Sequence, residues 1–199
     1  MAEMETVEGE SFSGEDWYGD ELGERHYVRC TFRDLDMTEL ASQGTVFEEC
    51  VFGNVKFNAS RHTDSAFLRC SFLRCNLFEA EFAGCKLTGS SFEQCTLRPL
   101  RVTGGDWSFV NLAEADLRGV TFQGVRMREA DLAMAHCDGA TFSGVDLSGA
   151  HLAKARFNKC DLRGSDLTAF HPAEVELRDA VIDATQAVVL VQALGLRIG

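Results

Sequence analysis

Eight cysteines and five histidines are the residues of this 199-residue chain best suited to chemistry. Cysteine pairs form disulfides, and clustered Cys and His side chains bind zinc. Seven of the cysteines, however, lie in one series of every fifth residue, and Cys137 lies in a second such series. A spacing such as that of Cys70 and Cys75 therefore reflects a repeat. We expect free, buried thiols that pack as small apolar residues.

The histidines form no catalytic arrangement in the sequence. His62 stands in an apolar series, where we expect a core hydrogen bond and not a general base. His151 and His171 are outward and twenty residues apart, which allows a surface metal site but is more typical of a solvated face. No Ser-His-Asp set or glycine-rich phosphate loop is present. We expect no enzyme, cofactor or metal site.

The charge is unevenly distributed along the chain. Its 31 acidic and 19 basic residues give a net charge of −12. Nine of the acids lie in residues 1–24, which contain no Lys or Arg, so the remainder is nearly balanced. An acidic protein disfavours direct binding to nucleic acid. Residues 1–24 are unlike a basic signal peptide, and the longest apolar run, Ala187–Val191, is too short for a membrane span. We expect a cytoplasmic protein.

A repeat of five residues organises most of the chain. From Phe12 to Ile182, 31 of the 35 residues at every fifth position are large and apolar. The series that holds the other seven cysteines lies two residues earlier and contains mainly Cys, Ala, Ser and Val. No charged residue between positions 26 and 185 occupies either series. This period fits neither an α-helix nor a β-strand. It predicts a coil with four flat sides, in which residues twenty apart stack over a continuous core.

Segments such as AEADLRGVTF, DLSGAHLAKARF and CDLRGSDL match the signature A(D/N)LXX, and on them the chain resembles the pentapeptide-repeat proteins. The resemblance implies an all-β fold, a right-handed quadrilateral β-helix of about eight coils over residues 25–182. At a strand spacing of ~4.8 Å this rod would be ~38 Å long. We expect the coil to begin near Tyr27, after an acidic extension, residues 1–24, that is flexible or lies along the outside.

The C-terminal segment, residues 183–199, predicts a helix that closes the coil. Asp183 and Gln186 are spaced as in a capping box, and Gly195 is a good helix stop. The residues between them are apolar nearly all round, so one side can cover the coil and the other needs a partner, most simply a second copy. The alternative is a monomeric cap with a partly apolar outside. The expected dimer interface comprises Val188, Val189, Leu190, Val191, Leu194 and Leu196.

Three further features resemble the fluoroquinolone-resistance members of this family: CTLRPL, where Pro99 interrupts the regular turn, SRHTDSAF with the inward His62, and the ending AVIDATQAVVLVQALGLRIG. That resemblance implies a dimeric rod that mimics DNA, binds and inhibits DNA gyrase, and lessens quinolone damage. The outward acids expected to face gyrase are Asp106, Glu114, Asp116, Glu129, Asp131, Asp146, Asp161 and Asp166.

Two other functions remain open on the sequence. Arginines are interleaved with these acids, so the pattern also fits a charge-balanced scaffold rod that has no role with topoisomerases. A self-resistance factor in an antibiotic producer, directed against a different gyrase poison, would carry the same repeat.

Overall fold

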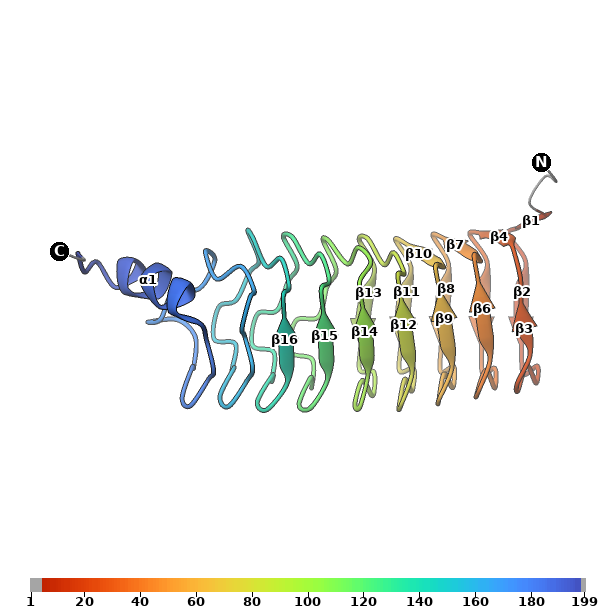
Figure 1. Cartoon of the computed structure of the whole chain (residues 1–199). Helices are drawn as coiled ribbons and strands as arrows, with labels where there is room; N and C mark the ends of the chain where they lie inside the picture. Colours follow the sequence, from red (N-terminus) through yellow and green to blue (C-terminus); the bar gives the residue numbers. More distant parts are fainter. Residues whose placement is uncertain (1–4, 198–199) are drawn as a thin grey trace.

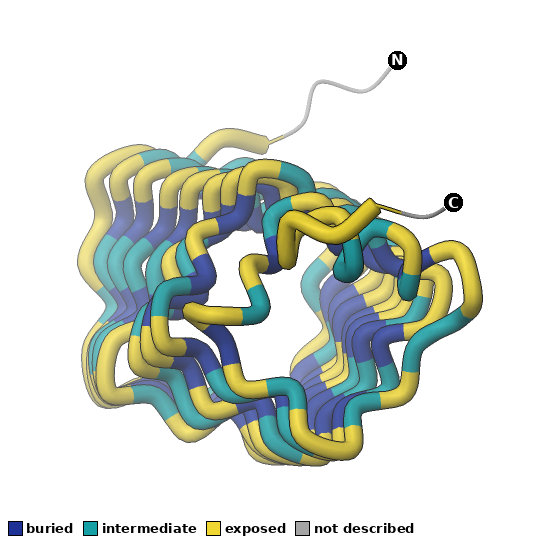
Figure 2. Tube along the Cα trace, turned by 90° about the vertical axis from the view of Figure 1, so that its left-hand side faces the viewer, coloured by how far each residue is buried: buried dark blue, intermediate teal, exposed yellow. Residues whose placement is uncertain are grey.

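The computed structural model describes residues 5–197 and is a straight solenoid with one helix at its C-terminal end (Figure 1). Residues twenty apart lie side by side on successive turns, as Phe32, Phe52 and Phe72 do, and every strand pairing is parallel. Viewed along its axis, the coil has four sides around a buried interior (Figure 2). The prediction of an all-β quadrilateral β-helix with a C-terminal helix is confirmed.

We number the sides as faces 1 to 4 in chain order. Face 1 contains β1 (Glu5–Glu8), β4 (Arg25–Val28), β7 (Val46–Glu48) and β10 (Ala66–Leu68). Face 2 contains β2 (Ser11–Ser13), β5 (Thr31–Arg33), β8 (Val51–Gly53), β11 (Ser71–Leu73) and β13 (Ser91–Glu93). Face 4 contains β3 (Glu21–Leu22), β6 (Ala41–Gln43), β9 (Arg61–Thr63), β12 (Glu81–Ala83), β14 (Arg101–Thr103), β15 (Thr121–Gln123) and β16 (Thr141–Ser143).

Face 3 is held by single bridges between successive turns, from Asp16 to Thr96 and again from Asp116 to Glu176. Similar bridges extend the other three faces toward the C-terminus. The longest strand ladder, on face 4, has seven strands, so the wall is continuous over most of the rod.

Stacked side chains fill the interior. The rings of Phe32, Phe52, Phe72 and Phe92 form one column, with centroids 4.6–4.9 Å apart. Several of the small inward Cys and Ser residues donate a side-chain hydrogen bond to the carbonyl 23 residues earlier, on the preceding turn. Ser90, for example, donates to the carbonyl of Phe67 at 2.7 Å. The small series therefore joins neighbouring turns as well as filling space between them.

The corners between faces use left-handed backbone. Gly84, Gly104, Gly124, Gly144 and Gly164 form such a column between faces 4 and 1, with φ between 61° and 73°. A left-handed φ is costly for most residues and free for glycine.

Pro99 breaks the corresponding column between faces 3 and 4. The equivalent corner residues of the neighbouring turns, Glu79 and Gly119, have φ of 58° and 70°. Proline cannot adopt a positive φ, because its ring fixes φ near −65°. The Arg98–Pro99 peptide is cis, and the bridges of face 3 stop at Thr96 and resume at Asp116. We call this gap between Thr96 and Asp116 the face 3 seam.

The coil begins one turn earlier than predicted. Strands β1, β2 and β3 pair in register with β4, β5 and β6, so residues 5–24 form a complete turn. The prediction of a flexible or externally laid segment before a coil start near Tyr27 is therefore wrong. Glu10, Glu15 and Asp20 stand where later turns carry small inward residues, which hid this turn in the sequence. Because no turn covers them, all three side chains are exposed and need not be small.

The C-terminal helix α1 (Ala184–Ala193) follows the last turn and lies at one edge of the opposite end (Figure 1). Asp183 and Gln186 form the predicted capping box. Gln186 also donates to the carbonyls of Leu162 and Ser165, at 2.6 and 2.8 Å, which fastens the helix to the last turns of the coil. Within residues 5–197, no helix has the length and apolar character needed to cross a membrane.

Candidate interaction surfaces

The eight acids predicted to face a partner are spread around the rod. Asp106, Asp146 and Asp166 share face 1, where Asp106 and Asp146 are separated by Arg126 in one bridged column. The other five lie on other sides or corners: Glu114, Asp116, Glu129, Asp131 and Asp161. The structure therefore brings three of the eight onto one face and does not gather the rest there.

Six of these acids, all aspartates, cap their own turns. The Oδ1 atom of Asp146 accepts hydrogen bonds from the backbone nitrogen of Ser148 at 3.2 Å and from its hydroxyl at 2.7 Å. The same bond to the nitrogen two residues on is made by Asp106, Asp116, Asp131, Asp161 and Asp166. Asn76 and Asn111 make it too, which explains why the repeat signature accepts Asp or Asn. Sequence reasoning missed this structural role.

Arginines neutralise half of the eight acids. Asp106 pairs with Arg126 at 2.9 Å, and Asp146 pairs with Arg128 at 2.5 Å. Asp116 and Asp161 pair with the arginines two residues on, and these hydrogen bonds lower the pKa of both carboxyls. Among residues 5–197, three of the predicted acids have no ion-pair partner: Glu114, Glu129 and Asp166.

The first turn is the most negatively charged part of the structure. Residues 5–24 carry eight acids and no Lys or Arg, and of these acids only Glu5 and Glu8 form ion pairs within the described chain, with Arg25 and Arg29. One turn rises ~4.8 Å, a length over which duplex DNA carries about three negative charges. The first turn therefore exceeds the charge density of DNA. Sequence reasoning noted its acidity but assigned it to a tail.

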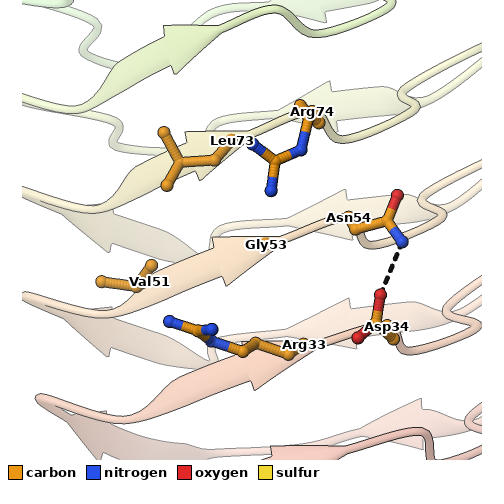
Figure 3. Close-up of a pocket in the computed structure, with 7 residues that line it drawn as sticks. All are labelled: Arg33, Asp34, Val51, Gly53, Asn54, Leu73 and Arg74. Carbon is orange, nitrogen blue, oxygen red and sulfur yellow. Dashed lines mark hydrogen bonds between the residues drawn. The ribbon is translucent and has the colours of Figure 1, made fainter.

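A shallow hollow on face 2 has the opposite character (Figure 3). It opens at Gly53, which has no side chain to fill it. Arg33 and Arg74 flank it from the turns on either side, and neither has an ion-pair partner within residues 5–197. The nearby carboxylate of Asp34 accepts a hydrogen bond from Asn54 at 2.5 Å. This part of face 2 is cationic and does not resemble a phosphate backbone.

Helix α1 leaves apolar side chains in solvent. Leu190 packs on the core, whereas Val188, Leu194 and Leu196 are 40%, 57% and 58% exposed. The remaining residues of the predicted dimer interface, Val189 and Val191, are partly buried. Val188 on the helix and Leu194 and Leu196 just after it thus leave exposed apolar surface at the C-terminal end.

His62 lies in a buried polar network on face 4. Its Nδ1 atom is 2.7 Å from the hydroxyl of Ser42, and its Nε2 atom is 3.1 Å from that of Ser60. Ser60 donates its proton to the carbonyl of Phe57, so it accepts from Nε2–H, and Nδ1 accepts from Ser42. The ring is neutral, and burial lowers its pKa to about 3. The predicted core hydrogen bond of His62 is confirmed.

The outward histidines and the cysteines form no cluster suited to metal binding. His151 lies 3.3 Å from a carboxylate oxygen of Asp131, and together with His171 it lines a shallow depression near the C-terminal end. Between residues 5 and 197, no three His, Cys, Asp or Glu side chains come together as metal ligands. All eight cysteines are free thiols.

The sequence is similar to known repeat proteins over part of its length. A family model described as a pentapeptide repeat region matches residues 75–152. The pentapeptide repeat protein MfpA of Mycobacterium tuberculosis is 40% identical over 89 residues, 45% of this chain and 49% of that protein. MfpA of Mycolicibacterium smegmatis is 33% identical over 64 residues, 31% of this chain and 34% of that protein. The chain thus spans half or less of the curated relatives it matches.

Solved structures extend the likeness of fold to nearly the whole chain. Two trypsin-treated variants of QnrB1, a plasmid-mediated fluoroquinolone resistance protein, give TM-scores of 0.89 and 0.90 at 20% and 21% identity, covering 98% of each chain. HetL, a pentapeptide repeat protein of Nostoc involved in the regulation of heterocyst differentiation, gives 0.59 at 16% identity, covering 88% of this chain and 86% of its own. At these identities the likeness concerns the fold alone.

Proposed function

Because this chain carries a pentapeptide-repeat domain with the fold of a fluoroquinolone-resistance protein, we propose that it is a DNA mimic that binds and inhibits DNA gyrase and so lessens the effect of fluoroquinolones. The observation that carries the proposal is a rigid rod whose outward aspartates are fixed by their own turns. A basic DNA-binding surface would meet these carboxylates already in place, which reduces the entropy lost on binding. The rod is about 20 Å wide with its side chains, close to the width of a duplex.

The acids that we propose to face gyrase are those of face 1 together with Glu129, which has no ion-pair partner within residues 5–197 and lies at the corner between faces 1 and 2: Asp106, Asp146, Asp166 and Glu129. The ion pairs of Asp106 and Asp146 with Arg126 and Arg128 are exposed. Exposed pairs contribute little free energy, so a basic partner surface can replace those arginines at small cost. Binding of this kind weakens as salt is added.

We also propose that the protein forms a homodimer through α1. The exposed Val188, Leu194 and Leu196 would lie in the interface, and Leu190 would hold the helix on its own coil. Such a dimer places the helices at the centre and the two acidic first turns at the far ends. Its length approaches twice that of one rod, as a longer DNA segment would require.

A supercoiling assay with purified gyrase tests the proposal. We expect the protein to inhibit supercoiling, and to reduce DNA cleavage when a fluoroquinolone is added. The variant Asp106→Asn/Asp146→Asn/Asp166→Asn removes three charges but keeps each turn cap, because Asn76 and Asn111 already cap turns in this chain. We expect it to fold normally and to inhibit at least tenfold less, a loss of about 1.4 kcal/mol in binding.

A matched control is Asp131→Asn/Asp161→Asn, which keeps two caps on faces 2 and 4 and should inhibit as the unaltered protein does. Absence of inhibition by the unaltered protein, at low salt, would reject gyrase as the target. Equal loss in both variants would reject face 1 as the contact surface.

The second candidate is a scaffold rod with no topoisomerase role. The observation that favours it is the extent of ion pairing, since arginines neutralise four of the eight predicted acids. A scaffold rod would leave supercoiling by gyrase unchanged. It would also leave DNA cleavage unchanged when any gyrase poison is added.

A further inference from the structure

Cys75 and Cys95 form a stacked pair at the corner between faces 2 and 3. Strands β11 and β13 pair in register just before them, and Asn76 bridges to Thr96 just after them. The two Cα atoms are therefore one strand spacing apart, ~4.8 Å, which lies within the range found for disulfides. The residues above and below them in this column are Val55 and Ala115, so the pair is isolated.

The face 3 seam lies directly beside this pair. In a regular wall the backbone nitrogen of Asp116 would donate to the carbonyl of Cys95, as that of Asp106 donates to Cys85 at 3.0 Å. Within residues 5–197 that bond is missing, and the bridge from Thr96 to Asp116 is missing with it. An exposed ion pair, Arg98 with Asp116 at 3.1 Å, spans the gap instead. The wall is therefore open next to Cys95.

This opening makes Cys95 unlike the other thiols. It is partly exposed, whereas the other seven cysteines are buried. Interaction with the neighbouring Cys75 side chain lowers the pKa of Cys95, and the same contact raises the pKa of Cys75. Cys50 and Cys70 interact in a similar way, but both are enclosed by the core and are out of reach of a reagent in water. Reactive cysteines combine thiolate character with access, and only Cys95 has both.

We propose that Cys95 and Cys75 form an oxidation site that hydroperoxides convert to a disulfide. The Cys95 thiolate attacks the peroxide, the O–O bond breaks, and a sulfenic acid forms while the alcohol, or water from hydrogen peroxide, departs. The sulfur of Cys75 then attacks the sulfenic sulfur. The S–S bond forms, and the leaving hydroxide takes the proton of Cys75 and departs as water. Two thiols are oxidised by two electrons, and one peroxide is reduced.

The disulfide would join two successive turns on the N-terminal side of the seam. It would replace the hydrogen bonds that Cys75 and Cys95 donate to the carbonyls of Phe52 and Phe72, at 3.3 and 3.4 Å. The site would therefore link the redox state of the protein to the face 3 seam in its wall. This inference does not depend on gyrase binding.

The test treats the full-length protein with hydrogen peroxide and counts free thiols after unfolding. We expect two of the eight thiols to be lost, with the loss of two hydrogens in the intact mass and a reducible link between the peptides containing Cys75 and Cys95. Before oxidation, iodoacetamide should alkylate the folded protein at Cys95 at least tenfold faster than at any other cysteine, because alkylation follows access and thiolate content.

Serine variants separate the steps without unfolding the rod, since Ser90 and Ser165 already make the same hydrogen bond to the preceding turn. Cys95→Ser should abolish the link, and Cys75→Ser should leave a sulfenic acid that dimedone traps. Cys70→Ser is the matched control and should still form the link. A full thiol count after peroxide, a link between other cysteines, or thiol loss that persists in Cys95→Ser would each overturn the proposal.

Discussion

His62 places an imidazole in the core, and within residues 5–197 its ring nitrogens contact serine hydroxyls and no carboxylate. The folded state holds the ring neutral, because burial lowers its pKa to about 3, whereas an unfolded histidine has a pKa near 6.5. As the pH falls below 6.5, His62 binds a proton in the unfolded state but stays neutral in the folded state. Stability is therefore complete above pH 6.5 and is lost as the pH falls toward 3.

We predict that the free energy of unfolding falls by about 2 kcal/mol between pH 7 and pH 5 on account of His62. Urea denaturation at pH 7, 6 and 5 measures it. In His62→Gln, which cannot titrate, the fall over the same range should be smaller by that amount. The lowered pKa values of Asp106, Asp146 and Asp161 act below pH 4, outside this window. An equal fall in both proteins would show that His62 is accessible to protons.

The phenylalanine column gives a second prediction about single residues. Phe72 is fully buried between Phe52 and Phe92, with ring centroids 4.9 and 4.6 Å away, so Phe72→Ala should cost about 3–5 kcal/mol. Phe12 is half-buried in the terminal turn and stacks on Phe32 at 5.0 Å. We expect Phe12→Ala to cost about 1–2 kcal/mol, since part of its surface is already exposed. Urea denaturation distinguishes the two, and no cost at Phe12 would contradict a folded first turn.

At the scale of an element, the first turn protects an open end. Val7, Phe12, Trp17 and Leu22 are only half-buried there, and among the described residues β1, β2 and β3 each have one edge without a paired strand. Exposed edges promote association, and charged residues at inward positions oppose it. Glu10, Glu15 and Asp20 occupy three such positions.

We predict that Glu10→Ala/Glu15→Ala/Asp20→Ala associates through its N-terminal end. Light scattering should show species larger than the unaltered protein at the same concentration. The control Asp16→Asn/Glu21→Ala/Glu24→Ala changes the net charge equally on outward positions and should not associate. Association of both variants would mean that total charge, and not the inward carboxylates, keeps the ends apart.

The same turn shows where sequence reasoning stops. The spacing of Asp183 and Gln186 predicted the start of the C-terminal helix. The five-residue period was sufficient to predict four faces and the inward columns, because burial excludes charge from inward positions along most of the rod. That rule fails at Glu10, Glu15 and Asp20, where no further turn creates an interior. The same rule does not predict ion pairs such as that of Asp106 with Arg126, because they join different turns and depend on side-chain conformations. The seam at Pro99 was visible as an interrupted turn, but its effect on Cys95 required the hydrogen bonds.

At the scale of the whole molecule, the two ends of the rod differ in surface character. Its N-terminal end carries the surplus negative charge and its C-terminal end carries exposed apolar side chains, so the two ends are suited to different contacts. Like charges repel two N-terminal ends, whereas two α1 helices can bury Val188, Leu194 and Leu196 against each other. Self-association is therefore expected at the C-terminal end alone.

We predict that Val188→Asp converts a dimer to a folded monomer. Val188 is 40% exposed on the outer side of α1, so the monomer tolerates a carboxylate there, while a dimer would have to bury it at a cost of several kcal/mol. Light scattering at micromolar concentration should give half the mass of the unaltered protein, with unchanged circular dichroism. Gln43→Glu adds the same charge to an exposed position on β6, far from α1, and should remain dimeric. X-ray scattering should give Val188→Asp a maximum dimension of nearly half that of the unaltered protein, because the two rods of the dimer join end to end. A Val188→Asp protein that keeps both its mass and its length would place the dimer contact elsewhere on the rod.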